Sequence, residues 1–209
     1  MKFLNKDIAL CLVPHPDDTA LCMSGLVKQY KDTIFHMLYL SAGTMTDETA
    51  GPNRFAEDLT FWRTFGVNNI IIDKVEGCTF DTSPQSKWIT TIEAKQIQFD
   101  VVFSTPKLDG HYEHVLTNAF MTPLTRFKPL TLVEYKTTSV THEWTPNLFV
   151  EMSDELLEEK CKCLLTSFPS QADATYFKID SLKAFHLDYI SKKRGYGFCE
   201  SFKINQLYL

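Results

Sequence analysis

The sequence predicts a single Rossmann-like α/β domain, with helices on both faces of a mostly parallel sheet. Apolar runs of strand length alternate along the chain with segments of helical period, which is typical of this fold class. A length of 209 residues and a hydrophobic content of 44% suit one domain with a sizeable core. The chain contains no internal repeat, low-complexity tract or proline-rich linker. We therefore expect one domain spanning residues 1–209.

The first half of the chain predicts a βαβ unit followed by a long loop. The near-continuous apolar run 8–14 indicates a strand buried on both faces. A helix follows, and its apolar residues recur at three- and four-residue steps: Ala20, Met23, Val27 and Tyr30. The second strand is expected at 34–40. Glycines, a proline and small polar residues then predict a loop at 41–53, at a strand end where ligand sites form in this class.

Further helices and strands alternate through the rest of the chain. An apolar stripe over 55–65 predicts a helix that stops at Gly66. Ser153 is expected to cap another helix, because acidic residues follow it in the first turn. The other expected elements are strands at 69–73, 101–105, 130–135, 147–152 and 202–207, and helices at 85–98 and 181–191.

Composition excludes several classes of function. With 21 basic and 26 acidic residues, the net charge of −5 disfavours a nucleic-acid partner held by charge. The charged N-terminus and the short apolar run after it predict neither a signal segment nor a membrane span. Six scattered cysteines without C-x2-C spacing indicate reduced thiols that fill gaps in the core. We expect a soluble, cytoplasmic protein.

The first polar cluster follows the first strand, in the run His15-Pro16-Asp17-Asp18. Capping of the next helix would explain one carboxylate, but not two carboxylates together with an imidazole. Such polarity at the end of a buried strand costs stability unless a cation or a hydrogen-bond network compensates. The run therefore favours a functional site.

A second polar cluster, residues 109–114, follows the fourth strand. In the common doubly wound strand orders, strands one and four are neighbours at the topological switch point, so the two clusters can meet. His111 and His114 are three residues apart, which places them on one face of a turn or helix start.

Together the two clusters predict a catalytic zinc site. Such sites use three protein ligands and leave one position for water, and His15, Asp18 and His114 fit that count. Asp17 then remains as a general base for the water, and His111 as a donor to an oxyanion. Another divalent transition metal, such as Fe²⁺, is a possible replacement for Zn²⁺.

These motifs resemble those of the zinc-dependent N-acetylglucosaminyl deacetylases of the LmbE-like (PIG-L) superfamily. That family has a His-Pro-Asp-Asp-Glu motif after the first strand and a later His-Pro-Asp-His. Further segments that resemble family elements are Ser41-Ala42-Gly43, Arg54 with Glu57, Phe65-Gly66-Val67, Lys160, Ser170-Gln171, and Glu200-Ser201-Phe202 after Tyr196. Two positions depart from the pattern: Thr19 replaces the family glutamate, and Tyr112-Glu113 replaces Pro-Asp.

The resemblance implies the same zinc ligands and the same roles for Asp17 and His111, in hydrolysis of the acetamide of an N-acetylated amino sugar or glycoconjugate. It makes Arg54 a candidate for holding a sugar hydroxyl or a phosphate, against the alternative of a surface ion pair with Glu57 or Asp58. Trp144 is a candidate for stacking on a pyranose face, against the alternative of packing over a loop. Loss of the glutamate at Thr19 is expected to affect metal affinity or the substrate pocket.

Three other functions remain open from the residues alone. Two histidines and a carboxylate also describe the facial triad of non-haem Fe(II) oxygenases, although those sites usually lie in a different fold. A two-metal phosphohydrolase would use the Asp109-Gly110-His111 segment and the Asp17-Asp18 pair. A non-catalytic carbohydrate-binding protein would keep the ion for structure or ligand contact. The sequence identifies neither the sugar conjugate nor the oligomeric state.

Overall fold

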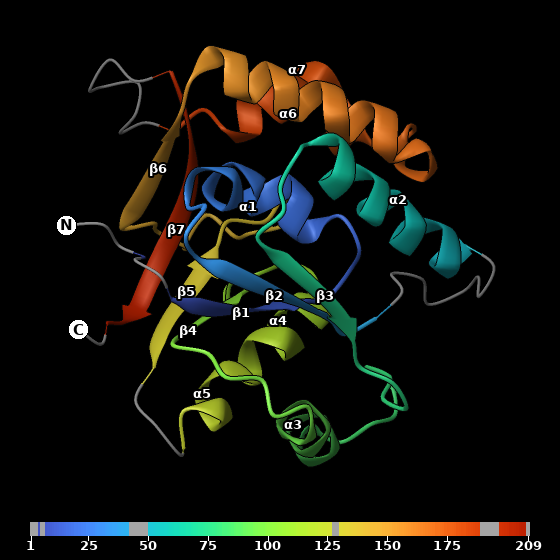
Figure 1. The fold of residues 1–209 in the computed structure, drawn as a ribbon, viewed down its shortest axis with the longest axis vertical. Coiled ribbons are helices and arrows are strands. Elements are labelled where there is room, and N and C mark those ends of the chain that lie inside the picture. The colour runs from blue at the N-terminus through green and yellow to red at the C-terminus, as the bar shows by residue number, and fades with distance from the viewer. Residues whose placement is uncertain (1–3, 5–6, 42–49, 127–129, 189–196, 208–209) are drawn as a thin grey trace.

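Helices cover both faces of a central sheet in the computed structural model, as Figure 1 shows. The structure describes residues 4, 7–41, 50–126, 130–188 and 197–207, with only the backbone at 50–53. Within these residues, seven strands form one sheet in the order β3-β2-β1-β4-β5-β7-β6. The strands are β1 (Ile8–Val13), β2 (Ile34–Tyr39), β3 (Ile70–Lys74), β4 (Val101–Ser104), β5 (Thr131–Tyr135), β6 (Leu148–Met152) and β7 (Phe198–Gln206).

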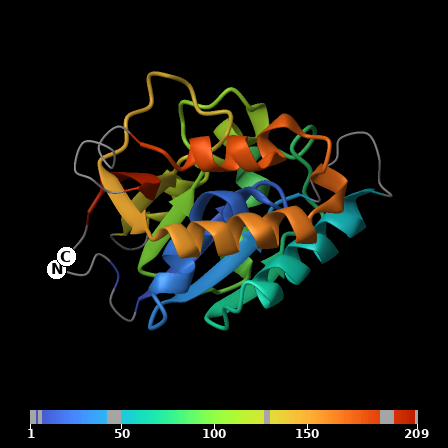
Figure 2. The ribbon, with the colours of Figure 1, turned by 90° about the horizontal axis from the view of Figure 1, so that it is seen from above.

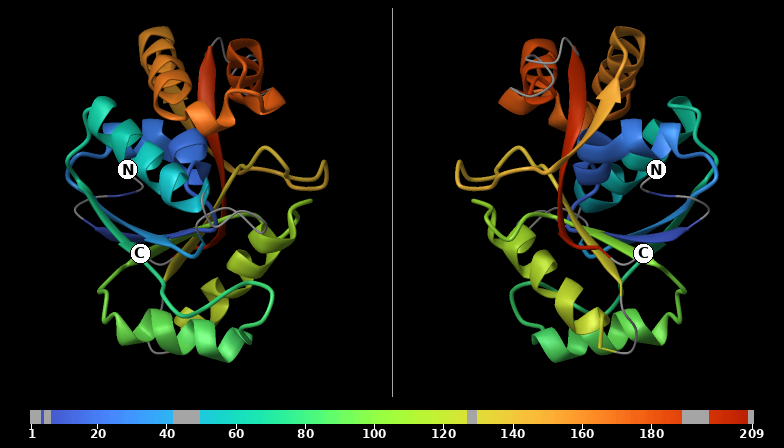
Figure 3. Two further views of the ribbon diagram at one scale, coloured as in Figure 1. Left: turned by 90° about the vertical axis from the view of Figure 1, so that its right-hand side faces the viewer. Right: turned by 90° about the vertical axis from the view of Figure 1, so that its left-hand side faces the viewer.

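The helices divide between the two faces of the sheet, as Figure 2 and Figure 3 show from other sides. One face carries α1 (Asp18–Gln29) and α2 (Ala50–Thr64), with α6 (Asp154–Ser167) and α7 (Ile179–Phe185) packed outside them. The other face carries α3 (Gln85–Ala94), α4 (Tyr112–Ala119) and α5 (Met121–Leu124). Two short 3-10 helices, η1 (Pro169–Gln171) and η2 (Thr175–Phe177), link α6 to α7.

The order of the parallel strands confirms the expected topology. Strands β3, β2, β1, β4 and β5 pair in parallel, whereas β7 is antiparallel to both β5 and β6. Strand β1 pairs with β4 in a register that places Cys11 opposite Phe103. The carboxyl ends of β1 and β4 therefore lie side by side, at the point where the chain reverses its direction of strand addition. This is the expected Rossmann-like fold, in a single domain.

Strand β1 shows why the central strands are almost entirely apolar. Ala9, Cys11 and Val13 pack into the cluster beneath α1, α2 and α6, whereas Leu10 and Leu12 pack into the cluster beneath α3 and α5. Because side chains alternate across a strand and both faces are covered, every position after Ile8 is buried. These two hydrophobic clusters support the strands whose carboxyl ends carry the polar residues.

Several element boundaries differ from the sequence predictions. The helix expected at 85–98 ends at Ala94, and Gln96 has φ of +51°, which a helix interior does not allow. Helix α2 begins at Ala50, inside the predicted loop 41–53, and residues 42–49 of that loop lie outside the described residues. Strand β7 begins at Phe198, four residues before its predicted start.

Two further differences concern helices. The helix expected at 181–191 is α7, Ile179–Phe185, and residues 189–191 lie outside the described part of the chain. The segments α4, α5, η1 and η2 had not been expected as helices. Each spans eight residues or fewer, which is too short for a clear helical repeat of apolar residues.

Candidate metal centre

The structure brings the two polar clusters together at the carboxyl ends of β1 and β4. His15 and Asp17 lie in the turn between β1 and α1, and Asp18 begins α1. His111 is the N-cap residue of α4, and His114 lies in the first turn of that helix. The ring centroids of His15 and His111 are 4.8 Å apart, and those of His111 and His114 are 4.6 Å apart. Residues almost one hundred positions apart in the chain thus share one site.

Donor atoms of His15, Asp18 and His114 converge on one point. Nδ1 of His15 lies 3.3 Å from Nε2 of His114. The Asp18 carboxylate lies 3.2 Å from the first nitrogen through Oδ2 and 3.5 Å from the second through Oδ1. A tetrahedral zinc site with bonds of about 2.0–2.1 Å has ligand atoms roughly 3.3–3.4 Å apart. The three side chains therefore fit the ligand set of a tetrahedral metal with one position left over.

Carboxylates on the far side of both imidazoles orient the two rings. Glu113 bonds Nε2 of His15, and Asp109 lies 3.1 Å from Nδ1 of His114. These hydrogen bonds assign the ring protons to Nε2 of His15 and Nδ1 of His114, so the opposite nitrogens present lone pairs to the shared point. Carboxylate–histidine–metal chains of this kind are usual in zinc proteins.

Asp109 is itself held by several donors. Its carboxylate accepts hydrogen bonds from the hydroxyls of Thr137 and Ser139 and from the backbone N–H of His111, at 2.7 Å for the last. Burial opposes ionisation of Asp109, but His114 and these hydrogen bonds outweigh burial and lower its pKa. A carboxylate already satisfied in this way is poorly placed to bind a second metal ion.

A different trio of ligands is also geometrically close. Donor atoms of His15, His111 and His114 all lie within 4.8 Å of one another. This limit is wider than the edge expected for a tetrahedral zinc site, whereas Asp18 lies 3.2 and 3.5 Å from the two imidazole nitrogens, through a different carboxylate oxygen in each case. His111 is also exposed to solvent, while His15, Asp18 and His114 are each at most 9% exposed. We therefore favour Asp18 over His111 as the third ligand.

Without a cation, the charges of the site balance through protons. Burial disfavours the charged imidazole of His15, but the Asp18 and Glu113 carboxylates outweigh burial and raise its pKa to about 9. Burial also disfavours the charged imidazole of His114, but the Asp18 and Asp109 carboxylates outweigh burial and raise its pKa to about 10. Burial opposes ionisation of Asp18, but the two histidines hold its pKa well below its usual range. The site attracts positive charge, which a metal supplies when it displaces these protons.

Asp17 is adjacent to Asp18 in the chain and pairs with Arg54. Oδ2 of Asp17 lies 2.8 Å from Nη2 of Arg54, and Asp17 is only 4% exposed. Burial and the neighbouring Asp18 raise the pKa of Asp17 to about 7, although the Arg54 guanidinium opposes this rise. The Asp17 side chain makes no capping hydrogen bond with α1, so helix capping does not explain it. A carboxylate with a pKa near neutrality suits general base catalysis.

His111 lies beside the trio at the open side of the site. Burial lowers its pKa, and the neighbouring His114 and His15 lower it further. A neutral imidazole at pH 7 still has one N–H, which can donate to a developing oxyanion. The position and protonation of His111 are compatible with the predicted role.

The two predicted substrate-binding residues lie in different surroundings. Arg54 is at the site, although its ion pair is with Asp17 and not with the predicted alternatives, Glu57 or Asp58. Trp144 is only 6% exposed, and its indole N–H donates to Oε2 of Glu134 at 2.7 Å. The Trp144 ring is therefore packed within the protein and presents little surface to a sugar. Its role in substrate binding stays a prediction.

Two residues orient the histidines in a way that the sequence did not predict. Asp109 and Glu113 lie within the recognised cluster 109–114, and their spacing before and between the histidines was the available signal. Thr19, which stands where the family has a glutamate, is fully buried next to Asp18. The structure shows a glutamate at position 113 in the role of orienting His15.

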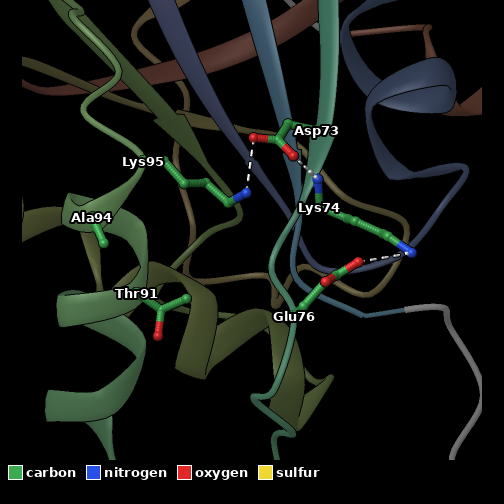
Figure 4. Close-up of a pocket in the computed structure, with 6 residues that line it drawn as sticks. All are labelled: Asp73, Lys74, Glu76, Thr91, Ala94 and Lys95. Carbon is green, nitrogen blue, oxygen red and sulfur yellow. Dashed lines mark hydrogen bonds and ion pairs between the residues drawn. The ribbon is translucent and has the colours of Figure 1, made fainter.

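One pocket of about 430 Å³ lies away from this site, between the end of β3 and α3. Figure 4 shows the residues that line it: Asp73, Lys74, Glu76, Thr91, Ala94 and Lys95. Lys95 pairs with Asp73 at 2.9 Å and Lys74 with Glu76 at 3.2 Å, so each cation already has a carboxylate. The pocket contains none of the predicted site residues.

All six cysteines are free thiols and all are buried. They act as small core side chains, as the sequence predicted. In the described part of the chain, we find no helix with the length and apolar character needed to cross a membrane.

Comparison with known proteins places both polar clusters in one family. The family model described as GlcNAc-PI de-N-acetylase, PIG-L, matches residues 10–125, which include all three proposed ligands. No curated protein matches the chain at a significant level.

Solved structures match over almost the whole chain. A conserved protein from Thermus thermophilus is 21% identical, with 96% of each chain covered and a TM-score of 0.73. The N,N'-diacetylchitobiose deacetylase from Pyrococcus horikoshii is 21% identical, covering 94% of this chain and 83% of its own, with a TM-score of 0.67. A 4-carboxy-2-hydroxymuconate hydratase from Pseudomonas putida is 14% identical, with 97% of each chain covered and a TM-score of 0.70. At these identities the likeness concerns the fold.

Proposed function

Because the chain belongs to the GlcNAc-PI de-N-acetylase (PIG-L) family, we propose that it is a metal-dependent deacetylase of an N-acetylated amino sugar or its conjugate. The convergence of His15, Asp18 and His114, with Asp17 beside them, is the observation that carries this proposal. The structurally similar chitobiose deacetylase supports the substrate class. The proposed deacetylase domain extends over residues 1–209.

Zn²⁺ is the proposed cofactor, held by His15, Asp18 and His114. When bound at such a site, zinc polarises a carbonyl and lowers the pKa of a water ligand to about 7. Imidazole and carboxylate donors also bind Fe²⁺, so we name zinc as the first candidate and not the sole one.

The residues of the chain have distinct tasks in the proposed hydrolysis. Asp17 takes a proton from the attacking water as its oxygen bonds to the acetamide carbon. His111 donates its N–H to the oxyanion that develops on the amide oxygen. Protonated Asp17 then returns the proton to the nitrogen as the C–N bond breaks, releasing acetate and a free amine. Glu113 and Asp109 hold the ligand rings in place.

A two-metal phosphohydrolase receives less support from the site than a deacetylase does. A two-metal phosphohydrolase needs further carboxylate ligands, but Asp109 is occupied by His114, Ser139 and Thr137. A hydratase shares the fold, so the fold alone does not decide the reaction.

Free thiols in the core favour a reducing compartment, and we propose a cytoplasmic location on that ground.

A screen for amine release tests the proposed function. The zinc-loaded protein should release free amine from N-acetylglucosamine, its oligomers or its glycosides, and a chelator should abolish release. Asp17→Asn should keep one metal ion per chain, and its kcat should be roughly 10²- to 10⁴-fold lower, because the substitution removes the base and leaves the ligands. His15→Ala should lose the metal itself. Asp32→Asn, an exposed aspartate after α1, is the control with no expected effect.

Other outcomes of the screen would contradict the proposal. Equal zinc content in Asp17→Asn and His15→Ala would reject the division between base and ligand. Two zinc ions per chain would favour phosphate chemistry. Bound zinc without amine release from any N-acetylated sugar or conjugate would favour a carbohydrate-binding protein.

A further inference from the structure

The backbone at Asp17 adopts a conformation that L-amino acids rarely adopt. Its φ is +130° and its ψ −30°, and the next residue begins α1. Such a conformation persists only where the surroundings hold it, and it is concentrated at functional sites. Contacts with neighbouring residues must therefore hold Asp17 in this conformation.

Arg54 makes two of these contacts. Its Nη2 lies 2.8 Å from Oδ2 of Asp17 and donates to the carbonyl oxygen of Pro16 at 3.3 Å. The guanidinium thus bonds both the Asp17 side chain and the peptide that precedes it. The side chains of Arg54 and Asp17 are only 12% and 6% exposed, so the pair is shielded from water. Charged hydrogen bonds are stronger in such surroundings.

The turn of α2 that carries Arg54 is itself anchored. Glu57, one turn further along α2, accepts hydrogen bonds from the backbone N–H of Ser170, at 2.9 Å, and from its hydroxyl. The next residue, Asp58, is fully buried and accepts a hydrogen bond from the Tyr39 hydroxyl at the end of β2. Helix α2, which carries Arg54, is therefore hydrogen-bonded both to the sheet and to the C-terminal half of the chain.

The contacts sort two adjacent carboxylates into different environments. Asp18 lies against the imidazoles of His15 and His114, whereas the ion pair of Asp17 is with Arg54. Without these separate contacts, the two neighbouring carboxylates would compete to bind a divalent cation, because the oxygens of either carboxylate are suitable zinc ligands.

We propose that Arg54 is a positioning residue, which clamps Asp17 beside the metal site and prevents it from becoming a ligand. Asp18 then ligates the metal, and Asp17 stays available to take a proton. This inference rests on the proposed function, in which Asp17 is the base. It gives Arg54 a task on the enzyme's own carboxylate, which the sequence did not predict.

Steady-state kinetics separate positioning from substrate binding. In Arg54→Gln, kcat should fall about 100-fold, the scale of loss that small misplacement of a reacting group produces, and KM should change less than about threefold. Arg54→Lys should recover part of kcat, because one donor and the charge remain. Arg63→Gln, an exposed arginine on the same helix, is the matched control. A raised KM with unchanged kcat in Arg54→Gln would overturn the proposal.

A double-mutant cycle tests whether Arg54 acts through Asp17. In the Asp17→Asn background, Arg54→Gln should change kcat by less than about threefold, because the group that it positions is gone. Losses that multiply would show that Arg54 acts on its own and would overturn the proposal.

The visible spectrum of the Co²⁺-substituted protein gives a readout that does not depend on turnover. Arg54→Gln should change the ligand-field bands as Asp17 moves onto the metal, and Asp17→Asn/Arg54→Gln should restore the spectrum of Asp17→Asn. An unchanged spectrum in Arg54→Gln would overturn the clamp. If the wild-type protein releases no amine from N-acetylated sugars, the proposed function fails, while the spectra still decide whether the clamp exists.

Discussion

At the scale of single residues, the two histidines proposed as ligands present different ring nitrogens to the shared point. His15 offers Nδ1 because Glu113 bonds its Nε2, and His114 offers Nε2 because Asp109 bonds its Nδ1. Each tautomer is therefore set by a carboxylate that does not itself reach the shared point. Residue type and position at strand ends predicted that these side chains would meet, but which nitrogen faces inward depends on ring orientation and could not be predicted.

Glu113→Gln should weaken zinc binding by roughly 10- to 100-fold, because an amide orients His15 and supports its basicity less well than a carboxylate does. Competition with a chromophoric chelator measures this change. Glu143→Gln, an exposed glutamate in the loop before β6, should leave the affinity unchanged. Equal affinities in wild type and Glu113→Gln would remove Glu113 from the metal site.

His186 predicts a pH dependence of stability that is separate from the metal centre. It is only 1% exposed, and neither ring nitrogen has a hydrogen-bond partner among the described residues. Burial, together with the neighbouring charges of Lys160 and Lys136, holds its pKa well below 6.5. Below pH of about 6.5 the unfolded chain binds a proton here that the folded chain does not, so stability is lost as pH falls.

Replacing His186 by phenylalanine should remove this part of the acid sensitivity. The melting temperature of His186→Phe should fall less steeply than that of wild type between pH values of about 6.5 and 5, as followed by circular dichroism. His142→Phe, at an exposed histidine, should follow the wild-type slope. Parallel curves for wild type and His186→Phe would show that this histidine does not stay neutral in the folded protein.

At the scale of elements, a buried ion pair ties α1 to α6 and β7. Lys160 of α6 lies 2.6 Å from Oε1 of Glu200 on β7, and both side chains are fully buried. The same carboxylate accepts the backbone N–H groups of Gly25 and Leu26 in α1, at 2.7 Å each. A Cβ at Gly25 would lie 2.7 Å from Sδ of Met152 and 3.0 Å from Oε1 of Glu200, so a larger residue would force these side chains to move. These hydrogen bonds hold the C-terminal half of helix α1, the helix that begins with Asp18, against β7.

Lys160→Met should cost about 3–5 kcal/mol in the free energy of unfolding, because it leaves the Glu200 carboxylate buried without its cation. Urea denaturation measures the loss. Lys162→Met, an exposed lysine on the same helix, should change stability by less than about 0.5 kcal/mol. Adding Glu200→Gln to Lys160→Met should recover part of the loss. A cost below about 1 kcal/mol for Lys160→Met would show that water reaches the pair.

The elements that the sequence predicted well are those with a strong local signal. Continuous apolar runs located β1, β2 and β4, and Ser153 caps α6 as expected, with its hydroxyl accepting from the backbone N–H of Leu156 at 3.2 Å. Contacts made only by tertiary packing were not predictable. The pairing of Arg54 with Asp17 and the burial of Trp144 against Glu134 depend on how distant segments meet.

At the scale of the whole molecule, topology creates the site. Because β1 and β4 are neighbours and parallel, His15 and His114 face each other across 99 positions of sequence. Neither segment supplies all three proposed ligands alone, so the proposed metal centre requires the folded chain. We therefore expect metal binding to be coupled to folding and to stabilise the fold by an amount that rises with metal concentration.

The account rests on one metal ion at the junction of β1 and β4. Anomalous diffraction from crystals of the zinc-loaded protein at the zinc absorption edge locates the ion most directly. We predict one peak per chain, bonded to Nδ1 of His15, Nε2 of His114 and the Asp18 carboxylate at about 2.0–2.2 Å, with Asp17 on Arg54 and outside the bonding distance. A peak ligated by His15, His111 and His114, or no peak between these two strands, would contradict the account.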